Sequence, residues 1–259
     1  MKSLYYIIPF LLFTLLSCER DDDTIAGQPG AHTYEPGVVI TLDDDYVDYW
    51  ADAHAILQEY QWKATFFITK CNQLSDGKIS KLQEFKHYGH EIGGHGLNHL
   101  NAPQQLAANG EAGYLSTEIY PMVSFMNGVS MPVTSFAYPF GARNEATDAV
   151  LLREFSILRG TTYGRPDPLF QNCYYTGRKV VYGLGIDKSY PHFNVPYFIS
   201  LLQYAKDNNK IVVFYAHKTV PTAYNDYETE YSTLIEICRY VKSNNMKFYT
   251  MSELPYLPL

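Results

Sequence analysis

The feature that most constrains the fold is a row of eight short apolar runs separated by helical stretches, all after residue 36. The runs lack polar–apolar alternation, which is typical of strands that are buried on both faces of a parallel sheet. The expected strands are GVVITL (37–42), KATFFIT (63–69), HEIGGH (90–95), TSFAYP (134–139), FSILRGT (155–161), KVVYGLGI (179–186), KIVVFYAHK (210–218) and MKFYTM (246–251).

Helical stretches lie between the expected strands. They cover residues 45–60, 76–89, 144–155, 194–209 and 228–245. Asn144 is placed to cap the third of these helices at its N-terminus. Seven or eight strand–helix units in one row predict a closed α/β barrel. An open doubly wound sheet is the alternative, but its first strand is usually followed by a Gly-rich phosphate turn, where this chain has Asp43–Asp45.

The first residues of the chain predict export. Lys2 is followed by an apolar run over 4–16, which is too short to span a bilayer as a helix. The run ends with LLSC at Cys18, which resembles a bacterial lipobox with cleavage before Cys18 and lipid on its sulfur. An ordinary signal peptide with an incidental cysteine is the alternative.

This resemblance divides the chain into three expected parts. Residues 1–17 are a lipoprotein signal peptide, 18–36 a lipidated cysteine with an acidic, Gly/Pro-rich tether, and 37–259 the catalytic domain. The expected location is the cell envelope of a Gram-negative bacterium. There the protein is an outer-membrane lipoprotein facing the periplasm or the surface, with the N-terminal lipid as its one membrane contact.

Net charge and cysteine count limit the class of partner and the disulfide content that we expect. A net charge of −7 disfavours nucleic acid as a partner, because phosphate binding needs a basic face. Only Cys71, Cys173 and Cys238 follow the tether, and this odd number forbids complete internal pairing. We therefore expect buried free thiols.

Polar side chains follow the carboxyl ends of several expected strands. Because these ends surround one opening of a (β/α) barrel, we expect the side chains to converge there. They are, in chain order, Asp43–Asp45, His95 with His99, the segment YPFGAR (138–143), Arg159 and His217.

His99 lies four positions after His95, a spacing that allows two imidazoles to reach one cation. With a carboxylate from another strand end, they suit Zn²⁺ or a different first-row ion such as Co²⁺, Ni²⁺ or iron. Two histidines and a carboxylate also form the facial triad of non-haem iron oxygenases. That reading is disfavoured here because the carboxylate precedes both histidines by about fifty residues in an α/β chain.

Together these residues resemble the polysaccharide deacetylases of carbohydrate esterase family 4, which contain the NodB homology domain. The resemblance covers about 37–254 and implies a distorted (β/α)7–8 barrel. The family's first motif, Thr-Phe-Asp-Asp-Gly, is similar to TLDDD, which implies Asp43 as general base and Asp44 as metal ligand. Its second, His-(Ser/Thr)-x-x-His, is similar to HGLNH and implies His95 and His99 as the other ligands.

The later motifs of the family imply the remaining roles. Its third motif ends Pro-Tyr-Gly and is similar to YPFG, which places Tyr138 and Pro139 at the substrate and makes the Phe140 N–H the oxyanion donor. Its last motif, Leu-x-His, is similar to YAH. This implies His217 as general acid, with Tyr215 where the family has leucine beneath the acetyl methyl group.

The chain departs from the family in its third motif. Ala137 stands where the family has an arginine that orients the base. Arg159 is expected to replace it because it follows a buried strand, where an unpaired charge is costly, and Arg143 is the alternative. The AYPF form is similar to the AYPYG of poly-N-acetylglucosamine deacetylases, which favours an N-acetylhexosamine glycan as substrate.

Two roles for acidic residues follow from the same comparison. Asp45 stands where the family has glycine and is expected to cap the following helix or to face solvent. The carboxylate that orients His217 is left open between Asp167 and Asp187.

The expected function is metal-dependent hydrolysis of N-acetyl groups on a polysaccharide or oligosaccharide, with release of acetate. An O-acetyl carbohydrate esterase, acting for example on acetylated xylan, is one alternative. A catalytically silent glycan-binding lipoprotein on the same scaffold is the other.

Overall fold

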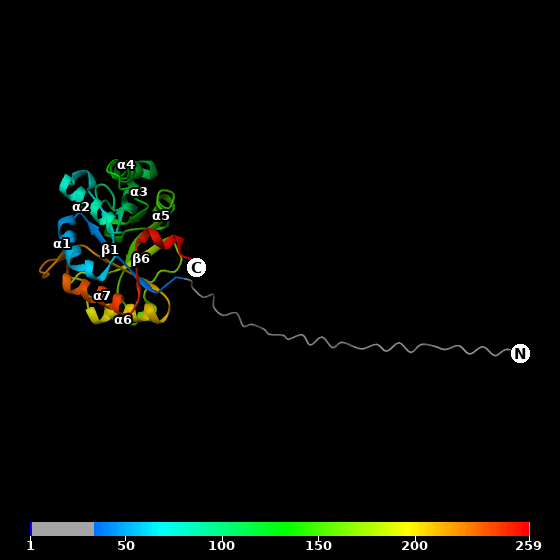
Figure 1. Ribbon diagram of the computed structural model, residues 1–259. Helices are drawn as coiled ribbons and strands as arrows, with labels where there is room; N and C mark the ends of the chain where they lie inside the picture. Colours follow the sequence, from blue (N-terminus) through cyan, green and yellow to red (C-terminus); the bar gives the residue numbers. More distant parts are fainter. Residues whose placement is uncertain (2–33, 259) are drawn as a thin grey trace. The chain divides into compact units, whose positions relative to one another are not determined.

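The computed structural model describes Met1 and residues 34–258, and Figure 1 shows the strands of this domain surrounded by helices. The predicted signal peptide, the lipobox at Cys18 and most of the tether lie outside the described residues. Within the described part, no helix has the length and apolar character needed to cross a membrane.

Seven parallel strands form a closed barrel, because β1 pairs with β2 on one side and with β7 on the other. An additional strand, β10 (Lys247–Tyr249), pairs with the first three residues of β1, whereas β2 pairs with the last four. This shared edge distorts the barrel and confirms the predicted fold. The barrel strands are β1 (Gly37–Asp44), β2 (Thr65–Ile68), β3 (Glu91–Gly94), β4 (Ser135–Ala137), β5 (Ile157–Thr162), β6 (Val180–Gly185) and β7 (Ile211–Ala216).

Helices cover the outside of the barrel (Figure 1). Asn144 caps α5 with a reciprocal capping box, as predicted, whereas α1 begins after Tyr46 without any side-chain cap. Of the two roles expected for Asp45, capping this helix is therefore wrong, and its half-exposed side chain agrees with the other, facing solvent. The helices are α1 (Val47–Leu57), α2 (Asp76–His87), α3 (Ala102–Tyr114), α4 (Tyr120–Gly128), α5 (Glu145–Leu151), α6 (Val195–Asp207) and α7 (Tyr231–Ser243).

Two helices, α3 and α4, were not predicted. Only Ala102 and Tyr114 of α3 are buried, so its sequence has little apolar periodicity to reveal a helix. A π-helical turn, Leu115–Ile119, joins the two helices without interruption.

The core explains why the barrel closes. Every residue of β7 is buried, and α6 and α7 each bury an apolar stripe at helical spacing, for example Leu234, Ile237, Cys238 and Val241 of α7. All three cysteines of the domain are buried and free, as predicted. After β7 the chain forms a small parallel pair, β8 (Lys218–Val220) with β9 (Glu228–Glu230), beside the carboxyl end of the barrel.

Candidate active site

A cavity of about 290 Å³ lies at the carboxyl ends of the strands and collects nearly all the predicted site residues. Pro139 is the exception, because it is buried in a short 3-10 turn (Pro139–Gly141) and does not line the cavity. The predicted residues that line it are Asp43, Asp44, His95, His99, Tyr138, Phe140, Arg159, Tyr215 and His217.

Asp44, His95 and His99 form the one group of potential metal-binding side chains found among the described residues. Their ligand atoms all lie within 4.8 Å of one another. The Nε2 atoms of His95 and His99 are 3.7 Å and 3.4 Å from Oδ1 of Asp44. Two imidazole nitrogens and one carboxylate oxygen match the donor set of Zn²⁺ and related first-row cations.

The protonation of His95 also suits a metal ligand. Its Nδ1–H donates to the carbonyl oxygen of Ala137 at 2.8 Å, so its Nε2 faces Asp44 with a free lone pair. Burial lowers the pKa of His95 to about 4, although the charges of Asp43 and Asp44 oppose that change. The ring is therefore neutral at physiological pH, and the residues present fit a divalent cation.

Asp43 forms a buried ion pair with Arg159, and both line the same cavity as the ligand group. Burial favours the neutral acid, but the charges of Arg159, His95 and His217 and the Arg159 hydrogen bond hold the pKa of Asp43 below its usual value. Asp43 is thus a carboxylate at neutral pH. Its Oδ1 has no hydrogen-bond partner, which leaves one oxygen to accept a proton.

Arg159 is completely buried and is held by aromatic rings as well as by Asp43. Its guanidinium carbon lies 5.6 Å from the ring centroid of Phe67 and 5.0 Å from that of Tyr215. The alternative, Arg143, instead pairs with Asp148 and donates to the Tyr182 hydroxyl. Arg159, and not Arg143, is therefore the arginine that contacts Asp43.

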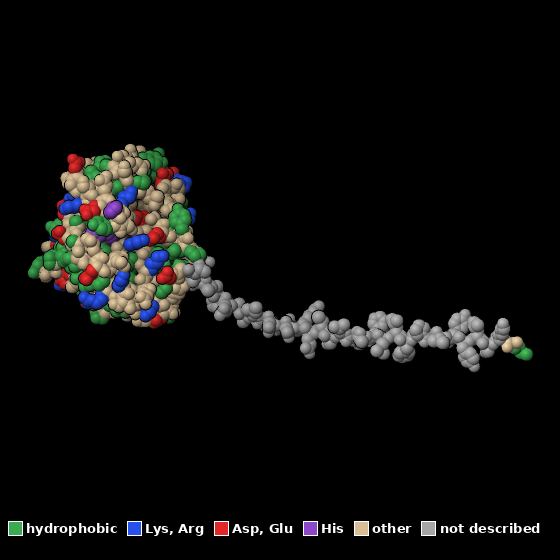
Figure 2. Space-filling model, viewed as in Figure 1, with side chains coloured by type: hydrophobic (Ala, Val, Ile, Leu, Met, Phe, Trp, Pro, Cys, Tyr) green, Lys and Arg blue, Asp and Glu red, His purple; other side chains and the backbone are tan. Residues whose placement is uncertain are grey.

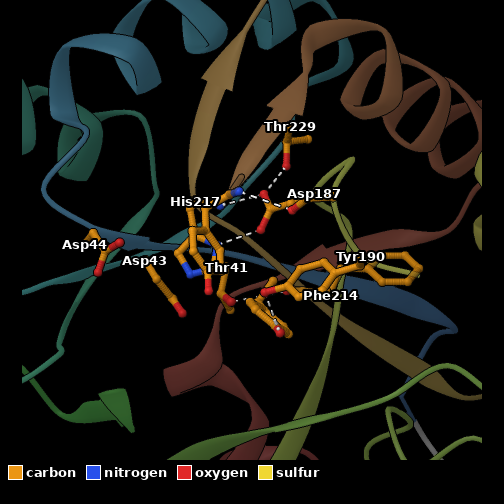
Figure 3. A network of polar contacts seen from close by, with 12 residues as sticks. Thr41, Asp43, Asp44, Asp187, Tyr190, Phe214, His217 and Thr229 are labelled. Carbon is orange, nitrogen blue, oxygen red and sulfur yellow. Dashed lines mark hydrogen bonds and ion pairs between the residues drawn. The ribbon is translucent and has the colours of Figure 1, made fainter. Parts of the chain in front are cut away.

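His217 is oriented by Asp187, as Figure 3 shows. The imidazole Nδ1–H donates to Oδ2 of Asp187 at 2.6 Å, and the backbone N–H of His217 donates to Oδ1 at 3.1 Å. The Thr229 hydroxyl donates to the same Oδ1 at 2.6 Å and fixes the carboxylate from the other side. Asp167, the other candidate, accepts a hydrogen bond from Leu169 instead.

The electrostatics of His217 differ from those of His95. Burial lowers its pKa, but the hydrogen bond and charge of Asp187, together with the charges of Asp43 and Asp44, raise it above the usual value. Since Asp187 accepts the Nδ1 proton, Nε2 is the nitrogen that can exchange a proton with a bound molecule. Asp187 thus favours the protonated form of His217 and leaves Nε2 facing the cavity.

Sequence reasoning missed Thr161, Thr162 and Tyr163, which line the cavity at the carboxyl end of β5, and three polar residues that contact predicted side chains. The hydroxyl of Tyr215 donates to that of Tyr190 at 2.9 Å, and the ring of Tyr227 lies 5.0 Å from that of His217. The third, Thr229, contacts Asp187 rather than the cavity. The last three, Tyr190, Tyr227 and Thr229, come from loops and from the small β8–β9 pair, where no strand-end pattern marks them, whereas Thr161 and Thr162 end β5 and could have been found by that pattern.

Strained backbone marks the cavity as well. Asp44, His99, Phe140 and Tyr227 all have positive φ, at 89°, 59°, 61° and 59°. Non-glycine residues rarely adopt this region, and such residues concentrate at functional sites.

The face seen in Figure 2 mixes acidic and basic side chains without a large field of either sign.

Residues 30–153 match the family model for polysaccharide deacetylase. A curated relative, "Putative polysaccharide deacetylase YxkH" of Bacillus subtilis (strain 168), is 30% identical over 122 residues. That match covers 44% of this chain and 40% of the relative.

Solved structures share the whole barrel. The chitin deacetylase of Colletotrichum lindemuthianum has a TM-score of 0.56 at 15% identity, with 86% of this chain and 88% of that chain covered. The Xyl-CE4 domain of a multidomain xylanase from the hindgut metagenome of Trinervitermes trinervoides has a TM-score of 0.54 at 19% identity, with 85% and 90% covered. Slightly less than half of the chain thus matches the polysaccharide deacetylase model, and the solved structures share its barrel fold.

Proposed function

We propose that the protein is a metal-dependent deacetylase that hydrolyses N-acetyl groups of an N-acetylhexosamine-containing glycan and releases acetate. The observation that carries the proposal is the meeting of three kinds of group in one cavity. These are a three-residue ligand set, a charged carboxylate held by Arg159, and a histidine held by Asp187.

Asp44, His95 and His99 would hold the cation, with Zn²⁺ the first choice for this donor set. When bound, such a cation acidifies water and polarises a carbonyl oxygen. The Ala137 carbonyl keeps His95 in the tautomer that presents Nε2 to the cation.

Asp43 and His217 would move the protons. Asp43 takes a proton from the attacking water through its unpartnered Oδ1, while Arg159 keeps the carboxylate oriented and charged. The backbone N–H of Phe140, which lies in a left-handed turn at the cavity, donates to the acetyl oxygen as negative charge develops there. His217 gives its Nε2 proton to the departing group.

The raised pKa of His217 favours amide substrates. An amine is a poor leaving group unless it is protonated, whereas an alkoxide from an ester leaves more readily. The O-acetyl esterase is the second candidate, because the same residues could cleave an ester and one structural neighbour is a domain of a xylanase.

Acetate release tests the proposal. The metal-loaded protein is offered N-acetylglucosamine oligomers or acetylated xylan, each with and without a chelator. We expect acetate from the oligomers that disappears with the chelator. Acetate from xylan alone would favour the esterase, and no acetate from either, in protein with bound metal, would favour a silent glycan-binding protein.

The proposed location rests on the sequence around Cys18. We propose an outer-membrane lipoprotein in which the 18–36 segment tethers the domain to the lipid. Radiolabelled palmitate incorporated into the wild type and lost in Cys18→Ala would support this. Equal labelling of both would contradict it.

A further inference from the structure

The loop between the two histidine ligands, residues 95–99, has an uncommon backbone. Gly96 and His99 both have positive φ, at 76° and 59°. For histidine this conformation is costly, so the surrounding structure must hold the loop in place. The position of His99 relative to Asp44 and His95 therefore depends on what contacts this loop.

Glu118 forms four hydrogen bonds with residues 97–100. Its Oε2 accepts hydrogen bonds from the backbone N–H and the side-chain amide of Asn98, at 2.8 Å and 2.9 Å. Its Oε1 accepts from the backbone N–H of Leu100 at 2.7 Å, and its own carbonyl accepts from Leu97 at 3.0 Å. One residue thus binds the chain on both sides of His99.

The environment of Glu118 shows that this contact is built into the fold. The residue is 1% exposed, and its carboxylate accepts hydrogen bonds from amides of Asn98 and Leu100. A buried carboxylate without such partners would be costly, whereas amide donors to a carboxylate form strong hydrogen bonds. The free-energy cost of desolvating Glu118 is therefore offset by hydrogen bonds that also order the loop.

Two further features place the carboxylate. Glu118 lies in the π-helical turn Leu115–Ile119, and such turns are rare and concentrate at functional sites. A Cβ at Gly96 would lie 2.8 Å from Oε1 of Glu118, so glycine is required for the carboxylate to approach.

We propose that Glu118 is a positioning residue that preorganises the metal site by fixing the loop between His95 and His99. This inference rests on the proposed function, since it takes Asp44, His95 and His99 as the ligands. Glu118 does not contact the ligand atoms and acts through the backbone of residues 97–100.

Glu118→Gln tests the proposal with Co²⁺ as the probe. An amide group would place N–H opposite an N–H of the loop, so at least one loop contact becomes repulsive. We expect Co²⁺ affinity to fall by about tenfold to a hundredfold, with a changed visible absorption spectrum of the bound ion.

Glu91→Gln is the matched control. Glu91 lies at the amino end of β3, away from the ligands, and also accepts three hydrogen bonds, from Ser135, Thr65 and Ser252. Its replacement should lower stability and leave the Co²⁺ affinity and spectrum of the folded protein unchanged. If Glu118→Gln does not fold, Gly96→Ala displaces the carboxylate from the loop side and should weaken Co²⁺ binding in the same direction.

The outcomes separate the two proposals. Wild-type affinity and spectrum in the Glu118 and Gly96 variants would overturn the positioning role while the metal site stands. Absence of Co²⁺ binding by the wild type would overturn the metal site, and the positioning role with it.

Discussion

Two histidine pairs in this molecule have nearly the same ring geometry and opposite chemistry. The ring centroids of His54 and His90, in the core, are 4.9 Å apart with planes at 78°. Those of His95 and His99, at the cavity, are also 4.9 Å apart, with planes at 67°. Ring spacing therefore does not distinguish a structural pair from a candidate metal site.

The difference lies in where the nitrogen lone pairs point. In the core pair, the Ala64 N–H donates to Nδ1 of His90, and Nε2–H of His90 donates to Nδ1 of His54, both at 3.0 Å. Trp62 donates to the same His54 nitrogen at 3.3 Å. These lone pairs are used within the core.

In the cavity pair, both Nε2 atoms instead face Asp44. A pair of histidines is thus a candidate ligand set when its lone pairs converge on a third acceptor. That acceptor is repulsive to them unless a cation or a proton lies between.

Replacing one histidine of each pair by alanine should give the largest difference between the two pairs. His99→Ala should abolish metal retention and lower the rate of acetate release by about a thousandfold or more, since a ligand is lost. The melting temperature of the metal-free protein should hardly change. His90→Ala should do the reverse, with a loss of about 2–4 kcal/mol in stability from the cavity and the unpaired Ala64 N–H, and near-normal activity per folded molecule.

Metal content, calorimetry and acetate release on both variants check this prediction. If His90→Ala loses metal, or His99→Ala loses comparable stability without metal, the two pairs are not separate in function.

Arg159→Ala should have the next largest effect. Losing the guanidinium misplaces Asp43 and should slow turnover about a hundredfold, with the fold retained. The pKa of Asp43 should rise, because Arg159 lowers it, so the acidic limb of the pH–rate profile should move to higher pH.

Arg143→Ala is the control for the arginine variant, since Arg143 pairs with Asp148 away from the base. An unchanged rate and pH profile in Arg159→Ala would remove this arginine from the account.

Asp187→Asn should have a smaller effect, of about tenfold on turnover. Asp187 raises the pKa of His217, so its neutralisation should lower that pKa. Because the general acid must be protonated, the alkaline limb of the pH–rate profile should move to lower pH. A limb that stays in place, measured over a full pH series, would show that another group supplies the proton.

The core histidines predict a gradual loss of stability in acid. Burial lowers the pKa of His90 to about 3, and the charges of His54 and Lys63 lower it too. In the unfolded chain His90 is protonated below about pH 6.5, so the contribution of the buried neutral ring to stability is fully present above that pH. It is lost as pH falls towards 3, at about 1.4 kcal/mol per pH unit.

Urea unfolding at several pH values measures this slope. His90→Gln should flatten it, and an equally steep slope in that variant would assign the acid sensitivity to other groups.

Much of the fold could be predicted because its signal is local. All eight expected strands are present. Strands such as β1 and β7 are buried along nearly all of their length, so their sequences are continuous apolar runs that can be recognised. The same rule, polar residues at strand carboxyl ends, also selects most of the side chains that line the cavity.

The missed residues lack such a signal. Glu118 lies inside the α3–α4 region, whose weak periodicity gave no helix, and it meets the loop only through the tertiary fold. Asp187 was one of two named candidates and lies two residues after the end of β6, so the strand-end rule could have preferred it to Asp167, which lies in a loop. Asp45 was expected to cap α1 or to face solvent, and only the cap is wrong, because Tyr46 takes the N-cap position.

The central claim is that neighbouring aspartates divide two roles, with Asp44 holding the cation and Asp43 moving the proton. The most direct measurement is metal content and acetate release on the same preparations of the wild type, Asp43→Asn and Asp44→Ala. The account predicts that Asp44→Ala loses the metal and activity together, whereas Asp43→Asn retains the metal and loses turnover. Equal loss of metal in both variants would contradict it.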